Sequence, residues 1–236
     1  MSQRSRVTRG MEIMARDGEI GAPASLETHG ANAKAPKTDR GRRTLRKLLD
    51  AAALEFGERG FHEASIAGVT SRGGLSIGTF YVYFDSKEAI FRALVADMGR
   101  LTRAWIGDRI KGAPDRLTAE RVGVTAYIEF VREHKNLHRI VTEAHSVAPD
   151  AYRAYYETFA EAYRRNLEEA AARGEISDGD HEERAWALIG IGSFLGWRYA
   201  IWSDDVDIAE IGAAAGDLIE NGLAPRPPFA PRKAKP

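Results

Sequence analysis

A short stretch of hydroxyl and aromatic side chains is the part of the sequence best suited to contact a polar partner. The stretch LSIGTFYVYF, residues 75–84, carries a serine, a threonine and two tyrosines around one glycine. Their hydroxyl groups can donate to phosphates and base edges, and the threonine methyl group can meet that of thymine. A glycine lets the backbone approach closely. The candidate contacts are Ser76, Gly78, Thr79, Tyr81, Tyr83 and, just beyond, the cation of Lys87.

The same stretch is rich in strand formers, yet its neighbours have helical spacing. Leu45, Leu48, Leu49, Ala52 and Phe56 fall on one face of a helix. A glycine at 60 is placed to end that helix, and a serine at 65 to cap a short one. The pair at 73–74 predicts a tight turn, and Asp85 or Ser86 can cap the following helix.

Residues 42–99 therefore predict four helices with a helix-turn-helix in the middle. If Ser76 caps the helix after the turn, Ile77, Phe80 and Phe84 share one sector, which we expect to face the core of the domain. The serine and threonine then point the other way, together with the second tyrosine. In such a motif the second helix enters the DNA major groove.

The segment SIAGVTSRGGLSIGTFYVYFDSKEAIFRAL resembles the helix-turn-helix signature of the TetR/AcrR family of bacterial transcriptional regulators. The resemblance implies an all-α homodimeric repressor with a three-helix DNA-binding domain and a C-terminal helical bundle for ligand binding and dimerisation. It implies that Thr79 and Tyr83 face base edges or nearby phosphates, that Tyr81 and Lys87 hold the backbone, and that Ser65 anchors the first helix of the motif. Gly73 stands where the family usually has alanine, which predicts a more flexible turn.

The expected organisation has four parts: a disordered basic extension over 1–38, the DNA-binding domain over 39–99, the ligand-binding and dimerisation domain over 100–224, and a disordered tail over 225–236. The chain has no net charge, but its first 47 residues carry 11 Lys and Arg against 5 Asp and Glu. This asymmetry fits either a polyanion partner at one end or a solvated tail. The basic lead-in RGRRTLRK, with Arg42 and Arg43, could follow phosphates or a minor groove, or be a plain solvated arm.

The C-terminal part predicts helices at roughly 117–133, 136–147, 149–173, 181–202 and 205–221, separated by glycine and proline. Small residues recur in the last two helices, and an interior glycine costs a helix about 1 kcal/mol relative to alanine. Close packing of helices is a reason to keep them, either between two subunits, which the resemblance favours, or within one. The expected dimer contacts are Gly192, Gly196, Ala200, Ile211 and Ala215.

The middle helices are unusually aromatic, and one tyrosine-rich stripe runs along residues 152–163. Aromatic walls with hydroxyl tips suit a hydrophobic effector with a few polar handles, such as an acyl-CoA or an aromatic compound, although ordinary core packing is the alternative. The candidate lining residues are Trp105, Tyr127, Phe130, His138, His145, Tyr152, Tyr156, Phe159 and Trp197.

Other classes of function find little support in the sequence. Asn136 is expected to cap a helix that leaves His134 outside, so the histidines at 134, 138 and 145 predict no metal site, and no cofactor is expected. No catalytic motif is present, so an enzyme is not expected. No secretory signal or bilayer-length apolar run appears, so we expect no membrane contact and a bacterial cytoplasmic location. The alternative function is a helical lipid- or drug-binding protein with a degenerate helix-turn-helix.

Overall fold

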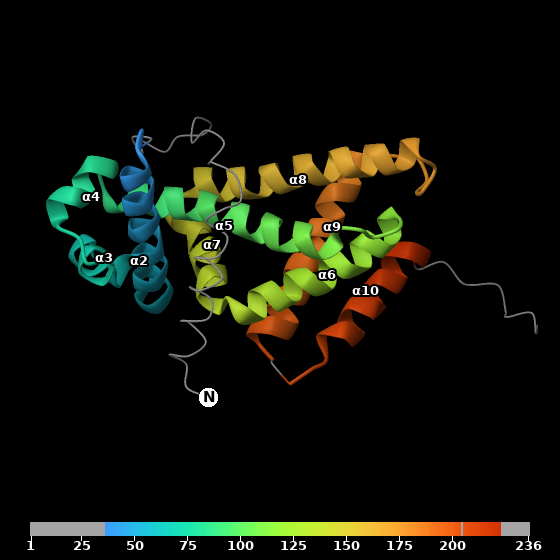
Figure 1. The fold of residues 1–236 in the computed structure, drawn as a ribbon. Coiled ribbons are helices and arrows are strands. Elements are labelled where there is room, and N and C mark those ends of the chain that lie inside the picture. Colours follow the sequence, from blue (N-terminus) through green and yellow to red (C-terminus); the bar gives the residue numbers. More distant parts are fainter. Residues whose placement is uncertain (1–35, 204, 223–236) are drawn as a thin grey trace, which may run out of the picture.

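The computed structural model describes residues 36–203 and 205–222, and within these ranges the chain is all-α. The predicted extension over 1–38 and tail over 225–236 lie almost entirely outside the described residues. Figure 1 shows the first helices of the described ranges gathered at one end of an elongated molecule and a helical bundle at the other. In chain order the elements are α2 (Asp39–Glu63), α3 (Ile66–Gly73), α4 (Ile77–Tyr83), α5 (Lys87–Ile110), α6 (Arg116–Glu133), α7 (Lys135–Val147), α8 (Pro149–Ala172), α9 (His181–Gly196), the π-helical turn η2 (Trp197–Ile201) and α10 (Ile208–Asn221).

The predicted signals at the ends of the first helices are confirmed. Gly60 has φ +78° and breaks the helical conformation near the end of α2. Ser65 and Ser86 cap α3 and α5 by accepting hydrogen bonds from backbone N–H groups three residues ahead. Gly74, with φ +62°, ends α3 in the left-handed conformation that glycine adopts without cost. These local signals fix the helix-turn-helix geometry.

The apolar face of α4 holds the motif against its own domain, with one exception. Phe80 and Phe84 are fully buried in the core shared by α2, α3 and α5. Ile77 was expected beside them, but half of its surface is exposed. It is the first residue of α4, where no preceding turn carries it towards the core. The short helix is therefore anchored by its two phenylalanines.

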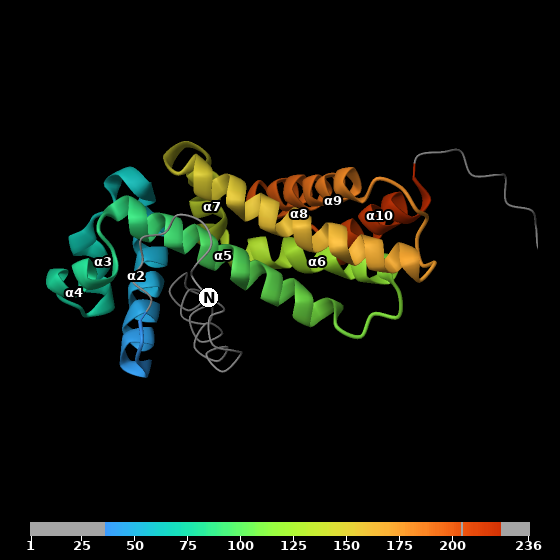
Figure 2. The same ribbon diagram turned by 90° about the horizontal axis from the view of Figure 1, so that it is seen from above.

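The long helix α5 connects the two ends of the molecule (Figure 2) and crosses the expected domain boundary at residues 99–100. Its N-terminal half packs against α2, and its C-terminal half packs against α6 and α8. An ion pair joins α2 to α5, since Arg46 donates to the buried Asp97 across 2.7 Å. Arg46 belongs to the basic lead-in, so one cation of that segment forms an ion pair within the protein.

The small residues of α9 and α10 pack within the subunit, which corrects the predicted dimer interface. Gly192, Gly196 and Ala200 are buried on the side of α9 and η2 that faces α6. A β-carbon on Gly196 would lie 3.0 Å from the ring of Tyr127. Ala215 is likewise buried where α10 crosses α6, and Ile211 is partly buried beside it. The spacing correctly predicted close helix approach, but the partner is α6 of the same chain.

Candidate nucleic-acid interface and effector pocket

The exposed surface of α4 carries apolar and hydroxyl groups and no charged side chain. Tyr81 and Val82 expose 50 and 58% of their surfaces, and Ser76 and Gly78 are also exposed. Thr79 lies at the edge of this face and is partly buried. The predicted contact residues therefore share one outward face at the end of the molecule, with Tyr83 as the exception.

Tyr83 is directed towards the start of α2 instead of standing out from the domain. Its ring packs against the core, and a β-carbon on Gly41 would lie 3.5 Å from its hydroxyl group. It remains partly exposed, at the junction of α4 and α2. This position suits contact with a phosphate beside the groove better than contact with a base edge.

The hydroxyl groups at the start of α4 are engaged with one another. Ser76 Oγ accepts a 3.1 Å hydrogen bond from the backbone N–H of Thr79 and lies 2.9 Å from Thr79 Oγ1. These contacts make Ser76 the predicted N-cap of the helix. They also hold the two polar side chains in a fixed arrangement.

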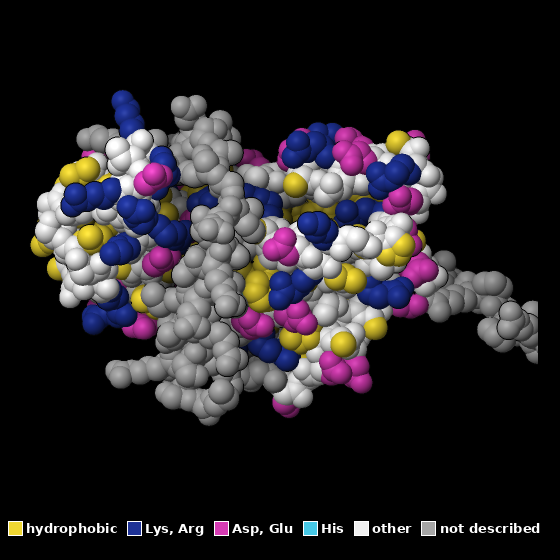
Figure 3. Space-filling view, in the orientation of Figure 1, with side chains coloured by type: hydrophobic (Ala, Val, Ile, Leu, Met, Phe, Trp, Pro, Cys, Tyr) yellow, Lys and Arg dark blue, Asp and Glu magenta, His cyan; other side chains and the backbone are white. Residues whose placement is uncertain are grey.

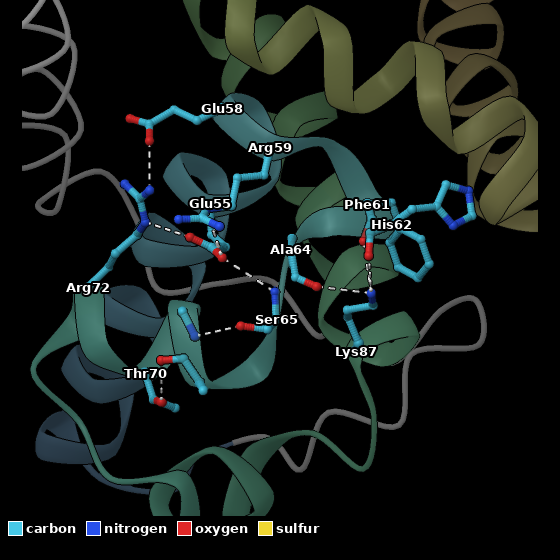
Figure 4. Close-up of polar contacts among 12 residues, drawn as sticks. Glu55, Glu58, Arg59, Phe61, His62, Ala64, Ser65, Thr70, Arg72 and Lys87 are labelled. Carbon is cyan, nitrogen blue, oxygen red and sulfur yellow. Dashed lines mark hydrogen bonds and ion pairs between the residues drawn. The ribbon is translucent and has the colours of Figure 1, made fainter.

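Lys87 has a structural role that sequence reasoning missed. Its Nζ donates to the carbonyl oxygens of Phe61, Ala64 and His62 at 2.9, 3.0 and 3.3 Å (Figure 4). An ammonium group has three N–H donors, so these contacts satisfy all of them. The geometry therefore does not support the expected phosphate contact; Lys87 instead fastens the end of α2 to the start of α5.

A second buried group, Glu55, holds α3 against α2. Its carboxylate is 2% exposed and accepts hydrogen bonds from Arg72 Nε at 2.7 Å and from the backbone N–H of Ser65 at 3.3 Å. A β-carbon on Gly68 would overlap this carboxylate. Figure 4 shows Glu55 and Arg72 reaching one another from α2 and α3. Ser65 thus anchors the motif through both its backbone and its side chain.

Basic residues of α2 flank α4 at this end of the molecule. Arg40, Arg43 and Lys47 are exposed at helical spacing on α2. Lys47 belongs to the turn of α2 that lies against Gly73, just before α4, while Gly41 lies beside Tyr83 at its other end. Lys and Arg side chains also gather over this end in the space-filling view (Figure 3). Arg42, in contrast, is paired with Asp39.

Within the bundle a small cavity lies between α5, α6, α8 and α9. Its predicted lining residues are Tyr127, Tyr156 and Phe159, and its volume is about 40 Å³. Burial raises the pKa of Tyr127 and Tyr156 above the usual range for tyrosine, so both phenols stay neutral hydrogen-bond donors at physiological pH. Two further lining residues, Tyr155 and Tyr163, belong to the tyrosine-rich segment 152–163, and the sequence did not indicate Ile106, Gly123, Val124, Leu188, Ile189, Gly192 and Ser193.

A wider cleft of about 640 Å³ adjoins this cavity and shares Tyr156, Ile189 and Ser193 with it. The predicted residues His145 and Tyr152 line the cleft and meet edge to face, with ring centroids 5.2 Å apart. The other walls include Arg153, Trp186 and Phe194, which come from α8 and α9. The arrangement combines an apolar recess with an outer cleft that holds one cation, Arg153, one carboxylate, Glu157, and the ring of Trp186.

Four predicted lining residues lie outside the cavity and the cleft. Trp105 and Phe130 form an aromatic cluster with His134, and Trp105 Nε1 donates to the Ala126 carbonyl at 3.0 Å. His138 pairs with Trp197, with ring centroids 5.6 Å apart. Aromatic type alone did not distinguish a core cluster from a cavity wall, because both bury apolar rings.

The junction between α6 and α7 also differs in detail from the expectation. His134, not Asn136, occupies the position before α7, and it makes no capping hydrogen bond through its side chain. Burial, aided by the nearby Arg109, lowers the pKa of His134 to about 4. No group of three or more His, Cys, Asp or Glu side chains arranged to hold a metal was found in the described ranges.

Comparisons with known proteins agree with the helix-turn-helix. The family model described as bacterial regulatory proteins, tetR family, matches residues 48–94. The HTH-type transcriptional regulator YdgC of Bacillus subtilis is 29% identical over 192 residues, which cover 79% of this chain and 96% of YdgC. YvdT, an HTH-type transcriptional regulator of the same organism, is 30% identical over 137 residues, which cover 56% of this chain and 70% of YvdT.

The fold is shared with the transcriptional regulator FadR from Bacillus subtilis, whose structure was determined in complex with stearoyl-CoA. The TM-score is 0.65 at 20% identity, over 75% of this chain and 98% of FadR. A helix-turn-helix at one end of an all-α chain, with a separate helical bundle, defines a class of transcriptional regulators. The chain belongs to the TetR family of bacterial regulatory proteins. None of its described helices has the length and hydropathy needed to cross a bilayer.

Proposed function

We propose that this TetR-type regulator is a repressor that binds operator DNA through α4 and the basic face of α2 and releases it when a hydrophobic small molecule binds the bundle. The observation that carries the proposal is the uncharged, exposed face of α4 flanked by exposed Arg40, Arg43 and Lys47. A groove-reading helix beside cations that neutralise phosphates is the arrangement such binding requires. The expected residues for DNA contact become Arg43, Ser76, Gly78, Thr79, Tyr81 and Tyr83, with Lys87 and Ser65 in supporting roles.

The effector that best fits the two connected spaces has an apolar part and a polar head, as in an acyl thioester. The recess between Tyr127 and Phe159, about 40 Å³ in volume, would take only the tip of the apolar part, and the phenol of Tyr156, which lines both spaces, could donate to a carbonyl oxygen. Arg153 and Trp186 in the outer cleft offer a cation for phosphate and a ring for stacking. The stearoyl-CoA bound by FadR supports an acyl-CoA as the class to test first.

Helix α7 is the route by which the effector site would reach the DNA-binding end. His145 of α7 lines the outer cleft, while Glu143 and Arg139 of the same helix bind the end of α2. Arg139 donates to the carbonyl oxygens of Gly57 and Glu58 at 3.3 and 3.2 Å. A shift of α7 would therefore move the segment to which Lys87 fastens α5. To reduce operator occupancy a hundredfold, the effector must favour the released state by about 2.8 kcal/mol.

We also propose that the protein acts as a homodimer, formed through the outward face of α9 and α10 and not through their buried small residues. Phe194 exposes 77% of its surface, and Leu218 of α10 exposes 38%. A β-carbon on Gly190 would meet no atom within 4 Å, so a partner helix can approach there. Two copies would place their α4 helices in successive major grooves, about 34 Å apart.

The experiment that tests the proposed function measures binding of the full chain to duplex DNA upstream of its own gene, with and without long- and short-chain acyl-CoAs. A specific complex that weakens at higher salt and dissociates with an acyl-CoA supports the proposal. Persistent DNA binding with every acyl-CoA would refute this effector class. Absence of a specific complex, together with acyl-CoA binding, would favour a ligand-binding protein with a degenerate helix-turn-helix.

A further inference from the structure

The recognition helix α4 lacks the side chains that usually read base edges by hydrogen bonding. Residues 75–84 contain no Arg, Lys, Asn, Gln, Asp or Glu, and these are the types that form the common hydrogen-bonded pairs with bases in the major groove. Its hydroxyl groups at Ser76 and Thr79 are held against one another at 2.9 Å. What remains to meet the bases is largely apolar surface.

That apolar surface is placed where the groove would be. At about 100° per residue, Gly78 and Val82 point directly away from the buried Phe80 and Phe84. Val82 exposes 58% of its surface, more than Tyr81 beside it. Ile77 exposes 51% at the N-terminal end of α4, which is the end of a recognition helix that approaches base edges.

Gly78 sits one turn before Val82 and presents only backbone. No atom outside its own turn comes near the position of a β-carbon: the nearest is Ser76 Oγ, at 3.8 Å. The helix can therefore approach a base pair closely on either side of the two apolar residues. The exposed cations of α2, Arg43 and Lys47, supply the charge complementarity that brings this face to DNA and not to an apolar partner.

We propose that Val82 and Ile77 read the C5-methyl groups of thymines in the major groove, so that each operator half-site carries thymine at the positions that these residues face. The proposal rests on the proposed function, because it concerns how the same DNA is selected. Thymine is the one base whose major-groove edge presents a methyl group. Aliphatic side chains gain by removing that group from water, whereas they gain nothing specific from the other three bases.

The test begins with duplexes that the full-length protein selects from a randomised library, without any assumption about the natural operator. The tightest duplex is then resynthesised with deoxyuridine in place of single thymidines, which removes one methyl group and leaves base pairing intact. We expect a loss of about fourfold in affinity for each methyl group that Val82 or Ile77 contacts, and about sixteenfold when both symmetric half-sites are changed.

The variants Val82→Ala and Ile77→Ala should each abolish the thymine-to-uracil difference at one position and leave it at the others. Both side chains are largely exposed, so neither change should disturb folding, which a thermal melt of the free protein can check. Lys47→Ala is the matched control: it should weaken binding to both kinds of duplex by the same factor, because phosphate contacts carry no sequence information.

The outcomes separate this inference from the proposed function. A selected duplex that binds equally well with uracil throughout overturns the methyl readout while operator binding stands. The same conclusion follows if the thymine preference survives both alanine variants. If selection enriches no duplex at all, the proposed DNA binding fails and the inference falls with it.

Discussion

The carboxylate of Glu143 in α7 accepts a 2.8 Å hydrogen bond from the backbone N–H of Phe61, where α2 ends. The two residues are 82 positions apart in the sequence, so the bond joins the bundle to the DNA-binding end. The other carboxylate oxygen is 3.1 Å from Arg139, which binds carbonyl groups of the same turn of α2. The Arg139–Glu143 ion pair thus binds a backbone N–H group after Gly60 and backbone carbonyl groups before it, where the helical conformation of α2 is broken.

Replacing Glu143 with alanine is expected to weaken both the fold and the response to effector. The variant leaves the Phe61 N–H without its acceptor, and the free energy of unfolding should fall by about 1–3 kcal/mol. Urea denaturation measures this change. In the DNA-binding assay, the effector should release a smaller fraction of the Glu143→Ala complex from DNA. The reason is that the end of α2 no longer follows a movement of α7.

The control for this variant is Glu169→Ala, which removes an exposed carboxylate from α8. It should alter stability by less than about 0.5 kcal/mol and leave the response to effector unchanged. A Glu143→Ala protein that is less stable but releases DNA as fully as the wild type would show that the contact is structural and carries no signal.

The two adjacent glycines of the turn should respond to alanine in opposite ways. At Gly73, a β-carbon would make ordinary contacts of 3.4 Å with Ala51 and Leu75, so Gly73→Ala should stabilise the protein by about 0.4–1 kcal/mol. Gly74 has φ +62°, where a side chain is strained, so Gly74→Ala should destabilise the protein by about 1 kcal/mol or more. Urea unfolding of the pair measures both signs.

This pair also tests the expected flexibility of the turn. A β-carbon at residue 73 restricts the last turn of α3, so a tighter specific complex for Gly73→Ala would show that the wild-type turn loses freedom when DNA binds. Equal affinity would show that Gly74 already defines the turn. If Gly73→Ala lowers stability, the packing between α2 and the end of α3 is tighter than the distances indicate.

Lys87 and Lys47 should separate structural from DNA-binding roles. Lys87→Met removes three hydrogen bonds to carbonyl groups at the end of α2, and we expect a loss of about 1–3 kcal/mol in the free energy of unfolding. Lys47→Ala changes an exposed residue and should leave stability within about 0.5 kcal/mol.

The salt dependence of DNA binding distinguishes the same two residues. Each lost phosphate contact reduces the slope of log affinity against log salt by about 0.9. Lys47→Ala removes one contact from each subunit of the proposed dimer, so the slope should fall by about 1.8 in total, and Lys87→Met should keep the wild-type slope. A reduced slope for Lys87→Met would mean that its ammonium group exchanges the carbonyl groups for phosphate when DNA binds.

The fold was largely predictable because the sequence marks most of its helix ends with local signals. Ser65, Ser76 and Ser86 each cap the helix expected of them, and Gly60 and Gly74 adopt positive φ where breaks were expected. These signals act over three or four residues, so a single sequence reveals them. The expectation failed at Ile77, where exposure depends on the end of a short helix and not on its periodicity.

The candidate site was less predictable, because the roles of its side chains depend on contacts between distant segments. Nothing near Lys87 in the sequence indicates the carbonyl groups of residues 61, 62 and 64. Similarly, Gly196 indicates close helix packing, but the sequence does not show that the neighbouring side chain is Tyr127, which lies 69 positions away. Periodicity predicts which face of a helix is buried, but the element that covers it follows from the tertiary fold.

The pH dependence of stability should report His138, a partly buried histidine of α7. Burial lowers the pKa of His138 to about 4, from an ordinary value near 6.5. The unfolded chain therefore binds a proton between pH 6.5 and 4 that the folded chain does not. The stabilisation is present above pH 6.5, and it is lost as the pH falls towards 4, with a magnitude of about 1–3 kcal/mol.

The measurement is urea unfolding at several values between pH 7.5 and 4.5, for the wild type and for His138→Gln. His134, whose pKa is also lowered to about 4, contributes in the same window, so the variant should keep part of the dependence. A pH profile that is identical in the two proteins would mean that His138 gains a partner for its unsatisfied Nε2.

The proposed dimer should depend on the exposed Phe194 and not on Gly192 and Gly196, which lie on the buried face of α9. Phe194 exposes 77% of its surface, and burying one phenylalanine side chain is worth about 1.5–3 kcal/mol. Phe194→Glu places a charge at the same point of both subunits, so the protein should sediment at the 26.0 kDa of one chain with an unchanged free energy of unfolding per subunit.

Gly196→Val is the opposite case, because its side chain would press on Tyr127, 3.0 Å from the β-carbon position, inside the subunit. That variant should lose about 1–3 kcal/mol of stability and still sediment as a dimer. If Gly196→Val dissociates while its subunit stays folded, the face of α9 that carries the glycines forms the interface. If Phe194→Glu remains a dimer, the face that carries Phe194 does not.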